Sequence, residues 1–177
     1  MLAPSPLSAS PARISGPAER LSANALRRST DVTSPAEAAF ALICEVEKWP
    51  VWLTFLKSAR ALDSRRLAPG SEVALRGAIP GELEELYEVD QFLEGHIVSL
   101  VGAYSVRRRI DFRVERKSEY SKVVVRLDYP CYGGMLGTLI DRMTVRRKLD
   151  MQLGDSLVHF KGLVEFKEAS AEQLIDF

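Results

Sequence analysis

The chain has 177 residues, the usual length of one domain, and 46% of them are hydrophobic, which is enough for a sizeable core. Its 24 basic residues balance 24 acidic ones, and the formal net charge of zero excludes a nucleic-acid binder that works through overall charge. Two cysteines are too few for a disulfide framework, and no apolar run approaches the ~20 residues of a membrane span, so reducing cytoplasm is the expected compartment.

Residues 1–20 differ from the rest because Ala, Ser, Pro and Gly dominate them. Such a segment buries little apolar surface, and we predict a flexible extension. Its arginines and its shortage of acidic residues also suit an organelle transit peptide, which stays open as a second interpretation. We expect one folded domain over residues 21–168 and a loose tail over residues 169–177.

Residues 21–32 predict a first strand, and a helix follows it. Ser34 is placed to cap that helix, Pro35 fits its first position, and Glu37 has the capping-box spacing from Ser34. An apolar face then recurs at helical spacing, formed by Phe40, Ile43 and Cys44. A second short helix follows, with an aromatic cluster of Trp49, Trp52 and Phe55. This cluster either anchors the helices in the core or forms a lid over a cavity mouth.

Six short segments come next, and turn signals recur between them at the 8–12-residue spacing that is typical of an antiparallel meander. The predicted strand segments are Leu56–Leu67, Ser71–Ile79, Glu82–Leu93, His96–Tyr104, Val106–Glu115 and Tyr120–Cys131. Two of them alternate clearly, which predicts one face toward the core and one toward water. One face of the first holds Leu83, Glu85, Tyr87, Val89 and Gln91, and one face of the second holds Val106, Arg108, Ile110, Phe112 and Val114.

After Gly133 and Gly134 the hydrophobic period changes to that of a helix. The apolar stripe that predicts this long helix consists of Leu136, Leu139, Ile140, Met143, Met151, Leu157, Phe160 and Val164. A long amphipathic helix that crosses a curved sheet leaves a hollow between the two, which is a common place for a small ligand.

Three pieces of the chain carry a resemblance to a known superfamily: SPAEAAFALICEVEKWPVW, the turn–strand series, and VVVRLDYPCYGGMLGTLIDRMTVRRKLDMQLGDSLVHFKGLVE. Over Leu21–Lys167 the chain resembles the START/SRPBCC superfamily, and most of all its polyketide cyclase/dehydrase and lipid-transport branch. The resemblance implies an α+β helix-grip fold. In this fold a curved antiparallel sheet of about seven strands wraps around a long C-terminal helix, and two short helices follow strand 1. The segment EVEKWPVWL is also similar to the quinone-binding and ribosome-associated branch.

The expected function is to bind a hydrophobic small molecule (a lipid, a polyketide or an isoprenoid-like compound) between the sheet and the C-terminal helix. The predicted ligand-binding residues rest on periodicity alone, so a slip of one residue would invert a strand. They are Leu83, Tyr87, Val98, Leu100, Tyr104, Arg108, Ile110, Phe112, Val125, Leu139 and Met143.

Two other functions stay open. The resemblance also implies a polyketide cyclase, aromatase or dehydrase without a metal, with Arg108, Glu85 and Tyr87 as catalytic candidates and Tyr104 as a further cavity residue. An inward Arg108 would need a carboxylate, a ligand or a path to water, and a structural Arg108–Glu85 pair near the cavity mouth is the preferred explanation. The other possibility is a protein-partner module with a filled core and no open cavity, as in the ribosome-associated branch.

No cofactor or metal is expected. The two histidines, His96 and His159, lie in unrelated segments, and the glycines after residue 132 lack the spacing of a dinucleotide fingerprint. Cys44 is expected in the core, whereas Cys131 either packs or lines the cavity. The basic residues on the outward face of Val106–Glu115 and the Arg146–Lys148 run have acidic neighbours, so a solvated surface is favoured over nucleic-acid binding.

Overall fold

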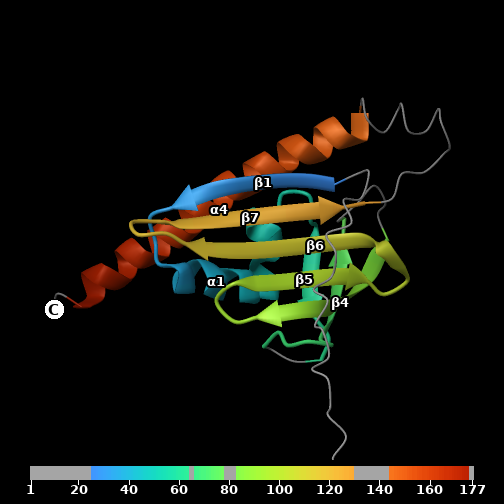
Figure 1. The fold of residues 1–177 in the computed structure, drawn as a ribbon, viewed down its shortest axis with the longest axis horizontal. Coiled ribbons are helices and arrows are strands. Elements are labelled where there is room, and N and C mark those ends of the chain that lie inside the picture. Colours follow the sequence, from blue (N-terminus) through green and yellow to red (C-terminus); the bar gives the residue numbers. More distant parts are fainter. Residues whose placement is uncertain (1–24, 64–65, 78–82, 130–143, 176–177) are drawn as a thin grey trace, which may run out of the picture.

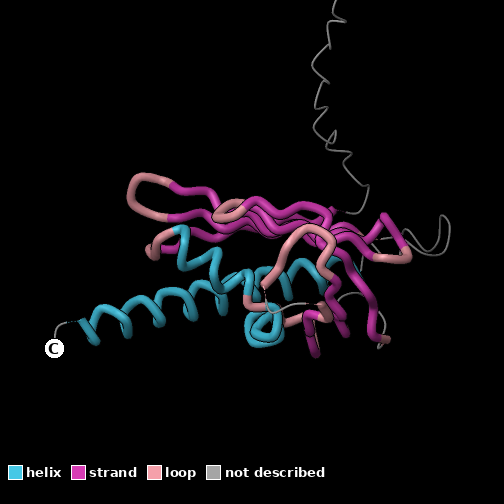
Figure 2. Tube along the Cα trace, turned by 90° about the horizontal axis from the view of Figure 1, so that it is seen from below, coloured by secondary structure: helices cyan, strands magenta, loops and turns pink. Residues whose placement is uncertain are grey.

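A seven-stranded antiparallel sheet forms one layer of the computed structural model, and the described helices pack on one side of it (Figures 1 and 2). The structure describes residues 25–63, 66–77, 83–129 and 144–175, so the predicted extension lies outside the described residues. The elements are β1 (Ala25–Val32), α1 (Ala36–Cys44), η1 (Val46–Lys48), α2 (Trp49–Trp52), β2 (Ser58–Ala61), β3 (Glu72–Arg76), β4 (Glu84–Leu93), β5 (Ile97–Gly102), β6 (Ser105–Arg116), β7 (Ser121–Asp128) and α4 (Arg146–Ile175).

The strand order is β1-β7-β6-β5-β4-β3-β2. Strands β2 to β6 each pair with the next strand in the chain, and β1 joins the sheet beside β7, with Ala25 opposite Asp128. The long helix α4 crosses the sheet on the same side as α1 and α2 (Figure 2). This arrangement confirms the predicted helix-grip fold.

The start of α1 differs from its prediction. The helix begins at Ala36, and Pro35 occupies the cap position with extended backbone (ψ 150°) and no side-chain cap bond. Ser34 is therefore one residue too far from the first turn to cap it. Glu37 forms an ion pair with Arg116 of β6 instead of a capping box. The predicted apolar face is confirmed, because Phe40 and Ile43 are buried and Cys44 is half-buried.

Four aromatic side chains connect the helices to the sheet. The ring centroid of Phe112 on β6 lies 5.2 Å from that of Trp49 and 5.8 Å from that of Trp52. Trp52 also lies 4.8 Å from Phe160 of α4. The indole Nε1 of Trp49 donates a hydrogen bond of 2.8 Å to the carbonyl oxygen of Ile43. Both tryptophans are fully buried, so the cluster anchors the core and is not a lid.

The structure also corrects part of the apolar stripe that the sequence predicts for helix α4. Met151 is 62% exposed, because at roughly 100° per residue it lies opposite the stripe that faces the sheet. The buried residues of α4 are Leu149, Leu153, Ser156, Leu157, Phe160 and Val164. The predicted members before residue 144 lie outside the described residues. The helix runs to Ile175, so the expected tail from residue 169 is helical up to that point.

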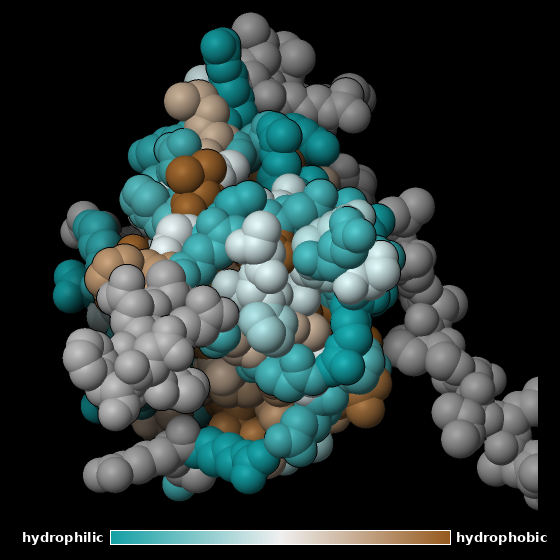
Figure 3. Space-filling model, turned by 90° about the vertical axis from the view of Figure 1, so that its left-hand side faces the viewer, coloured by the Kyte–Doolittle hydropathy of each residue, from teal (hydrophilic) through white to brown (hydrophobic). Residues whose placement is uncertain are grey.

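Several large apolar side chains are exposed on the surface. Figure 3, which views the left-hand side of Figure 1, shows hydrophobic residues scattered among hydrophilic ones. The exposed large apolar residues are Val51, Leu62, Leu83, Leu93, Tyr104, Tyr120, Met151, Val158 and Phe166. In the described part of the chain, no helix combines the length and the apolar character that crossing a membrane requires.

A polar clasp fixes α4 to the loop after α2. The hydroxyl of Ser156, which is fully buried, accepts a hydrogen bond of 2.9 Å from the backbone N–H of Thr54 and donates one of 2.6 Å to the carbonyl oxygen of Gln152. The hydroxyl of Thr54 donates to the same carbonyl oxygen at 2.9 Å. These bonds satisfy a loop N–H that burial would otherwise leave unpaired.

Substitution of Ser156 by Ala should lower the free energy of unfolding by about 1–3 kcal/mol, since it leaves the Thr54 N–H without an acceptor. Chemical denaturation followed by tryptophan fluorescence measures the loss. Ser58→Ala, at an exposed position of β2, is the control and should change little. Equal effects of the two substitutions would show that the clasp does not stabilise the fold.

Candidate functional site

Glu85, Tyr87 and Arg108, the three catalytic candidates of the sequence, meet at one end of the inner sheet face. Arg108 Nη1 forms an ion pair with Glu85 Oε1, and the hydroxyl of Tyr87 donates a hydrogen bond of 3.3 Å to Glu85 Oε2. The side chains of Arg108 and Glu85 are 18% and 25% exposed, whereas Tyr87 is fully buried. The structure therefore forms the expected Arg108–Glu85 pair, and it adds the Tyr87 hydroxyl to it.

An irregularity of the sheet allows β6 to reach β4 across the strand between them. Val101 of β5 pairs with Arg109, but the next residue, Gly102, pairs with Ser105, so residues 106–108 of β6 have no partner on β5. Gly102 also lies opposite Tyr87 of β4 and has no side chain. The Arg108 side chain can therefore pass over Gly102 to Glu85. The sequence shows this glycine, but its position opposite Tyr87 follows only from the pairing.

Tyr129 is a neighbour of this cluster that the sequence analysis missed. Its predecessor Asp128 pairs with Arg109, so Tyr129 comes next to Arg108 where β7 ends. Its side chain is 1% exposed. The alternation of Val125, Leu127 and Tyr129 at the end of β7 is the signal that would have found it.

Most of the predicted wall lies inside the protein. The fully buried wall residues are Val98, Leu100, Ile110, Phe112 and Val125, as the alternation predicts. They are closed to water in this structure, so the accessible part of the inner face is its polar end at Arg108 and Glu85.

Two wall residues differ from the prediction, because Leu83 and Tyr104 are 81% and 91% exposed. Leu83 precedes the first residue of β4, and Tyr104 lies in the turn between β5 and β6, so strand alternation governs neither. Their predicted inward orientation is wrong. Leu139 and Met143 lie outside the described residues.

The chemistry of the cluster is that of oxygen recognition. A guanidinium offers five N–H donors in a planar fork, which suits a carboxylate or a carbonyl oxygen. A paired carboxylate and a phenol add an acceptor and a donor beside it. The described residues contain no group of three side chains that could hold a metal ion. The cluster can therefore bind and orient an oxygen-bearing group by hydrogen bonds.

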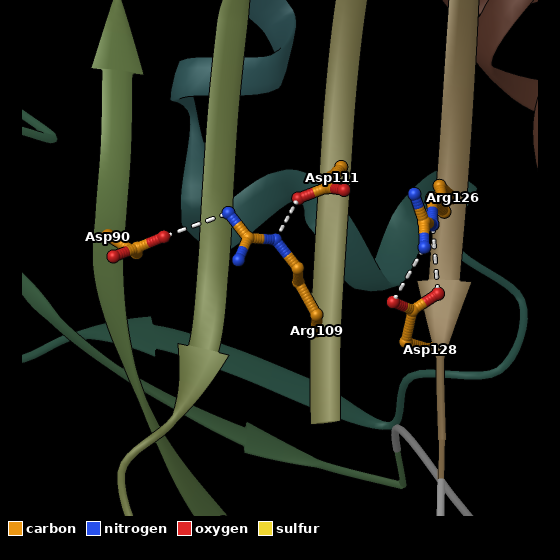
Figure 4. A network of polar contacts seen from close by, with 5 residues as sticks. All are labelled: Asp90, Arg109, Asp111, Arg126 and Asp128. Carbon is orange, nitrogen blue, oxygen red and sulfur yellow. Dashed lines mark hydrogen bonds and ion pairs between the residues drawn. The ribbon is translucent and has the colours of Figure 1, made fainter. Parts of the chain in front are cut away.

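A second network lies on the outward residues of β4, β6 and β7 (Figure 4). Arg109 Nη2 lies 2.8 Å from Asp90 Oδ2, and Arg109 Nε lies 2.8 Å from Asp111 Oδ1. Arg126 binds Asp128 through two bonds of 2.9 and 3.1 Å. These pairs neutralise the arginines, so the outward face of β6 is not a simple basic patch.

Cys44 is poorly suited to nucleophilic chemistry. Burial is the main cause that raises the pKa of its thiol to about 11, with a smaller opposite effect of Arg66 and a small further rise from Glu94. Since the thiolate is the reactive form, little of it exists at neutral pH. Cys44 thus acts as a packing residue of α1.

Cys44 should react with iodoacetamide roughly 100-fold more slowly than a free cysteine at about pH 7.5, and its rate should rise with pH toward 11. Peptide mapping by mass spectrometry measures the rate, and a Cys131→Ser background keeps the two thiols apart. Glutathione in the same reaction is the reference. Fast labelling of Cys44 in the folded protein at neutral pH would contradict the raised pKa.

Comparison with known proteins identifies the fold. No family model matches the sequence, and a search of curated proteins finds no match. Solved structures do match, among them DR_A0006 from Deinococcus radiodurans (21% identity, 81% of this chain and 98% of that chain, TM-score 0.59). The KanY protein has 16% identity over 80% of this chain and 97% of its own, with a TM-score of 0.64. A START superfamily protein from Mycobacterium smegmatis has 19% identity over the same shares, with a TM-score of 0.53.

At these identities the likeness shows the fold alone. The chain has the START-like helix-grip fold that its sequence predicts.

Proposed function

We propose that this protein binds a hydrophobic small molecule at the inner face of its sheet and holds the oxygen-bearing end of that molecule at Arg108, Glu85 and Tyr87. One observation carries the proposal: a half-buried Arg–carboxylate–phenol cluster ends a face that is otherwise apolar. Replacing a buried ion pair by apolar residues is often neutral or stabilising. A cluster of this kind at the end of an apolar inner face is therefore better explained by ligand recognition than by stability.

The apolar neighbours of the cluster define the class of ligand. Ile110, Leu100 and Val98 continue the inner face beyond the polar end, and they supply affinity at about 25 cal/mol per Å² buried. A lipid, polyketide or isoprenoid-like molecule with a carboxylate or carbonyl end fits this arrangement, in which a polar end is followed by an apolar face. The closed core must open to admit its body, and that opening lowers the affinity.

Two other functions each have an observation in their favour. The Tyr87 hydroxyl contacts the carboxylate that Arg108 binds, so a proton donor, an acceptor and a cation for a developing oxyanion lie together, as cyclase or dehydrase chemistry requires. The full burial of Leu100, Ile110 and Phe112 instead favours a partner module with a filled core. A binding measurement distinguishes the partner module, which binds no ligand, from the binding protein and the enzyme. A turnover measurement then distinguishes the enzyme from the binding protein.

Arg108→Met should weaken ligand binding about tenfold or more, because it removes a charged hydrogen-bond donor but keeps an apolar side chain of similar length. Oleic acid, menadione and emodin are the probes. Both tryptophans of the chain contact Phe112 of the inner face, so their fluorescence reports on binding. Native mass spectrometry of the purified protein measures the stoichiometry and detects any retained molecule.

The matched control is Arg113→Met, an exposed arginine of the same strand, which should bind the probes like the parent protein. Binding of no probe up to about 200 µM would contradict the proposal and favour the filled-core module. Equal binding by the Arg108 and Arg113 variants would show that the cluster is not part of the ligand site. Turnover that Glu85→Gln abolishes, with binding unchanged, would establish the enzyme alternative.

A further inference from the structure

The outward side of α4 carries an apolar line that no described element covers. Met151, Val158 and Phe166 are 62%, 70% and 73% exposed. Their spacings of seven and eight residues place them on one side of the helix, opposite the stripe that packs on the sheet. Figures 1 and 2 show that the C-terminal end of α4 projects beyond the strands, so this side is open to another molecule.

The middle of this line is flat. Gly154 and Gly162 lie four residues before and after Val158. A Cβ atom at either glycine would have open space around it, with no neighbouring heavy atom within 4 Å outside the adjoining helix backbone. Each glycine destabilises a helix by about 1 kcal/mol relative to Ala, and no close approach within the chain explains either one. Small residues at such positions allow a second helix to come close.

The two ends of the line differ in shape and charge. At its N-terminal end is an open hollow of about 350 Å³, lined by Thr144, Arg147, Lys148, Met151, Gln152 and Asp155. Near its C-terminal end the phenyl ring of Phe166 projects into solvent. Arg147 lies beside the first end, and Glu168 lies beside the second, about 80° around the helix from Val158. The ion pairs of α4 in the described part of the chain involve other residues.

We infer that this side of α4 is a homodimer interface in which two copies pack antiparallel about a two-fold axis at Val158. Phe166 of each copy then fills the hollow beside Met151 of the other. Gly154 of one copy faces Gly162 of its partner, and Arg147 faces Glu168.

The spacing along the helix supports this occupant. Counted from Val158, Met151 lies seven residues before it and Phe166 eight after, while Arg147 lies eleven before it and Glu168 ten after. A two-fold interface requires such reciprocal spacing, because each contact must occur twice. An unrelated helix does not require it. An anionic membrane would favour a uniformly basic surface, whereas Arg147 and Lys148 share this one with Asp155.

The inference does not depend on the proposed ligand, because the residues that pack α4 on the sheet are a separate set.

Sedimentation velocity of the full chain over about 1–200 µM tests the inference. We expect a monomer–dimer equilibrium, with the dimer weakened about tenfold or more by Val158→Arg and by Phe166→Ala. The first variant places two arginines together on the axis, and the second empties the hollow. Both positions are exposed in the monomer, so neither variant should lower the melting temperature at a concentration where the parent chain is monomeric. Val51→Arg, at a position of α2 that is 61% exposed, is the matched control and should dimerise normally.

Charge reversal separates this dimer from other associations. Arg147→Glu and Glu168→Arg should each weaken it, and the double variant should restore it because the two charges exchange places. A monomer at every concentration would overturn the inference. So would a dimer that Val158→Arg leaves intact, or single reversals that the double variant fails to rescue. Sedimentation of a monomeric chain with phosphatidylserine vesicles would also overturn it, in favour of a membrane surface.

Discussion

The contact of Trp52 with Phe112 and Phe160 is the constraint on which the rest of the structure depends. It joins three elements that are far apart in the chain: the short helix α2, the strand β6 and the long helix α4. Aromatic pairs of this geometry are worth about 0.5–1.5 kcal/mol beyond the area they bury. Because Trp49 also packs against Phe112 with its ring tilted by 51°, the helix pair and α4 are held against one strand. The distance between sheet and helix, and so the shape of the inner face, follows from these rings.

That inner face changes character along β6. Around Phe112 it is aromatic and closed, and four residues earlier, at Arg108, it is charged and half-open. Gly102 and the register shift beside it make the change possible, because they bring Arg108 within reach of β4. A buried ion pair is weak evidence for stability. The placement of this pair where solvent can still reach it fits a role in recognition.

Local periodicity predicts the orientation of side chains within strands and helices, and it fails at the ends of these elements. Alternation placed Arg108, Ile110 and Phe112 on one face correctly, since strand geometry leaves no other choice once one of them is inside. Leu83 and Tyr104 lie just outside strands, where that rule no longer holds. The cap of α1 moved by one residue for a similar reason.

The contacts that create the candidate site depend on pairing between distant segments. The passage of Arg108 over Gly102 requires a register shift that single-sequence patterns do not encode. The ion pair itself was predictable, because both partners alternate with inward residues. The clasp of Thr54 and Ser156 was not, because its two residues lie about a hundred positions apart along the chain. Periodicity in the sequence thus predicts which face of a strand or helix a residue lies on, whereas its contacts with distant segments follow only from the fold.

Helix α4 connects the two proposals physically. A ligand body can enter the closed inner face only if side chains such as Phe160 move, and Phe160 belongs to the helix whose other side carries Val158. A second copy packed on that outer side would hold α4 in place and oppose such a movement. Any change that dimerisation makes to ligand affinity must then equal the change that the ligand makes to dimer affinity. Because α4 closes the inner face on one side and contacts the partner copy on the other, opening of the inner face would depend on whether the partner is bound.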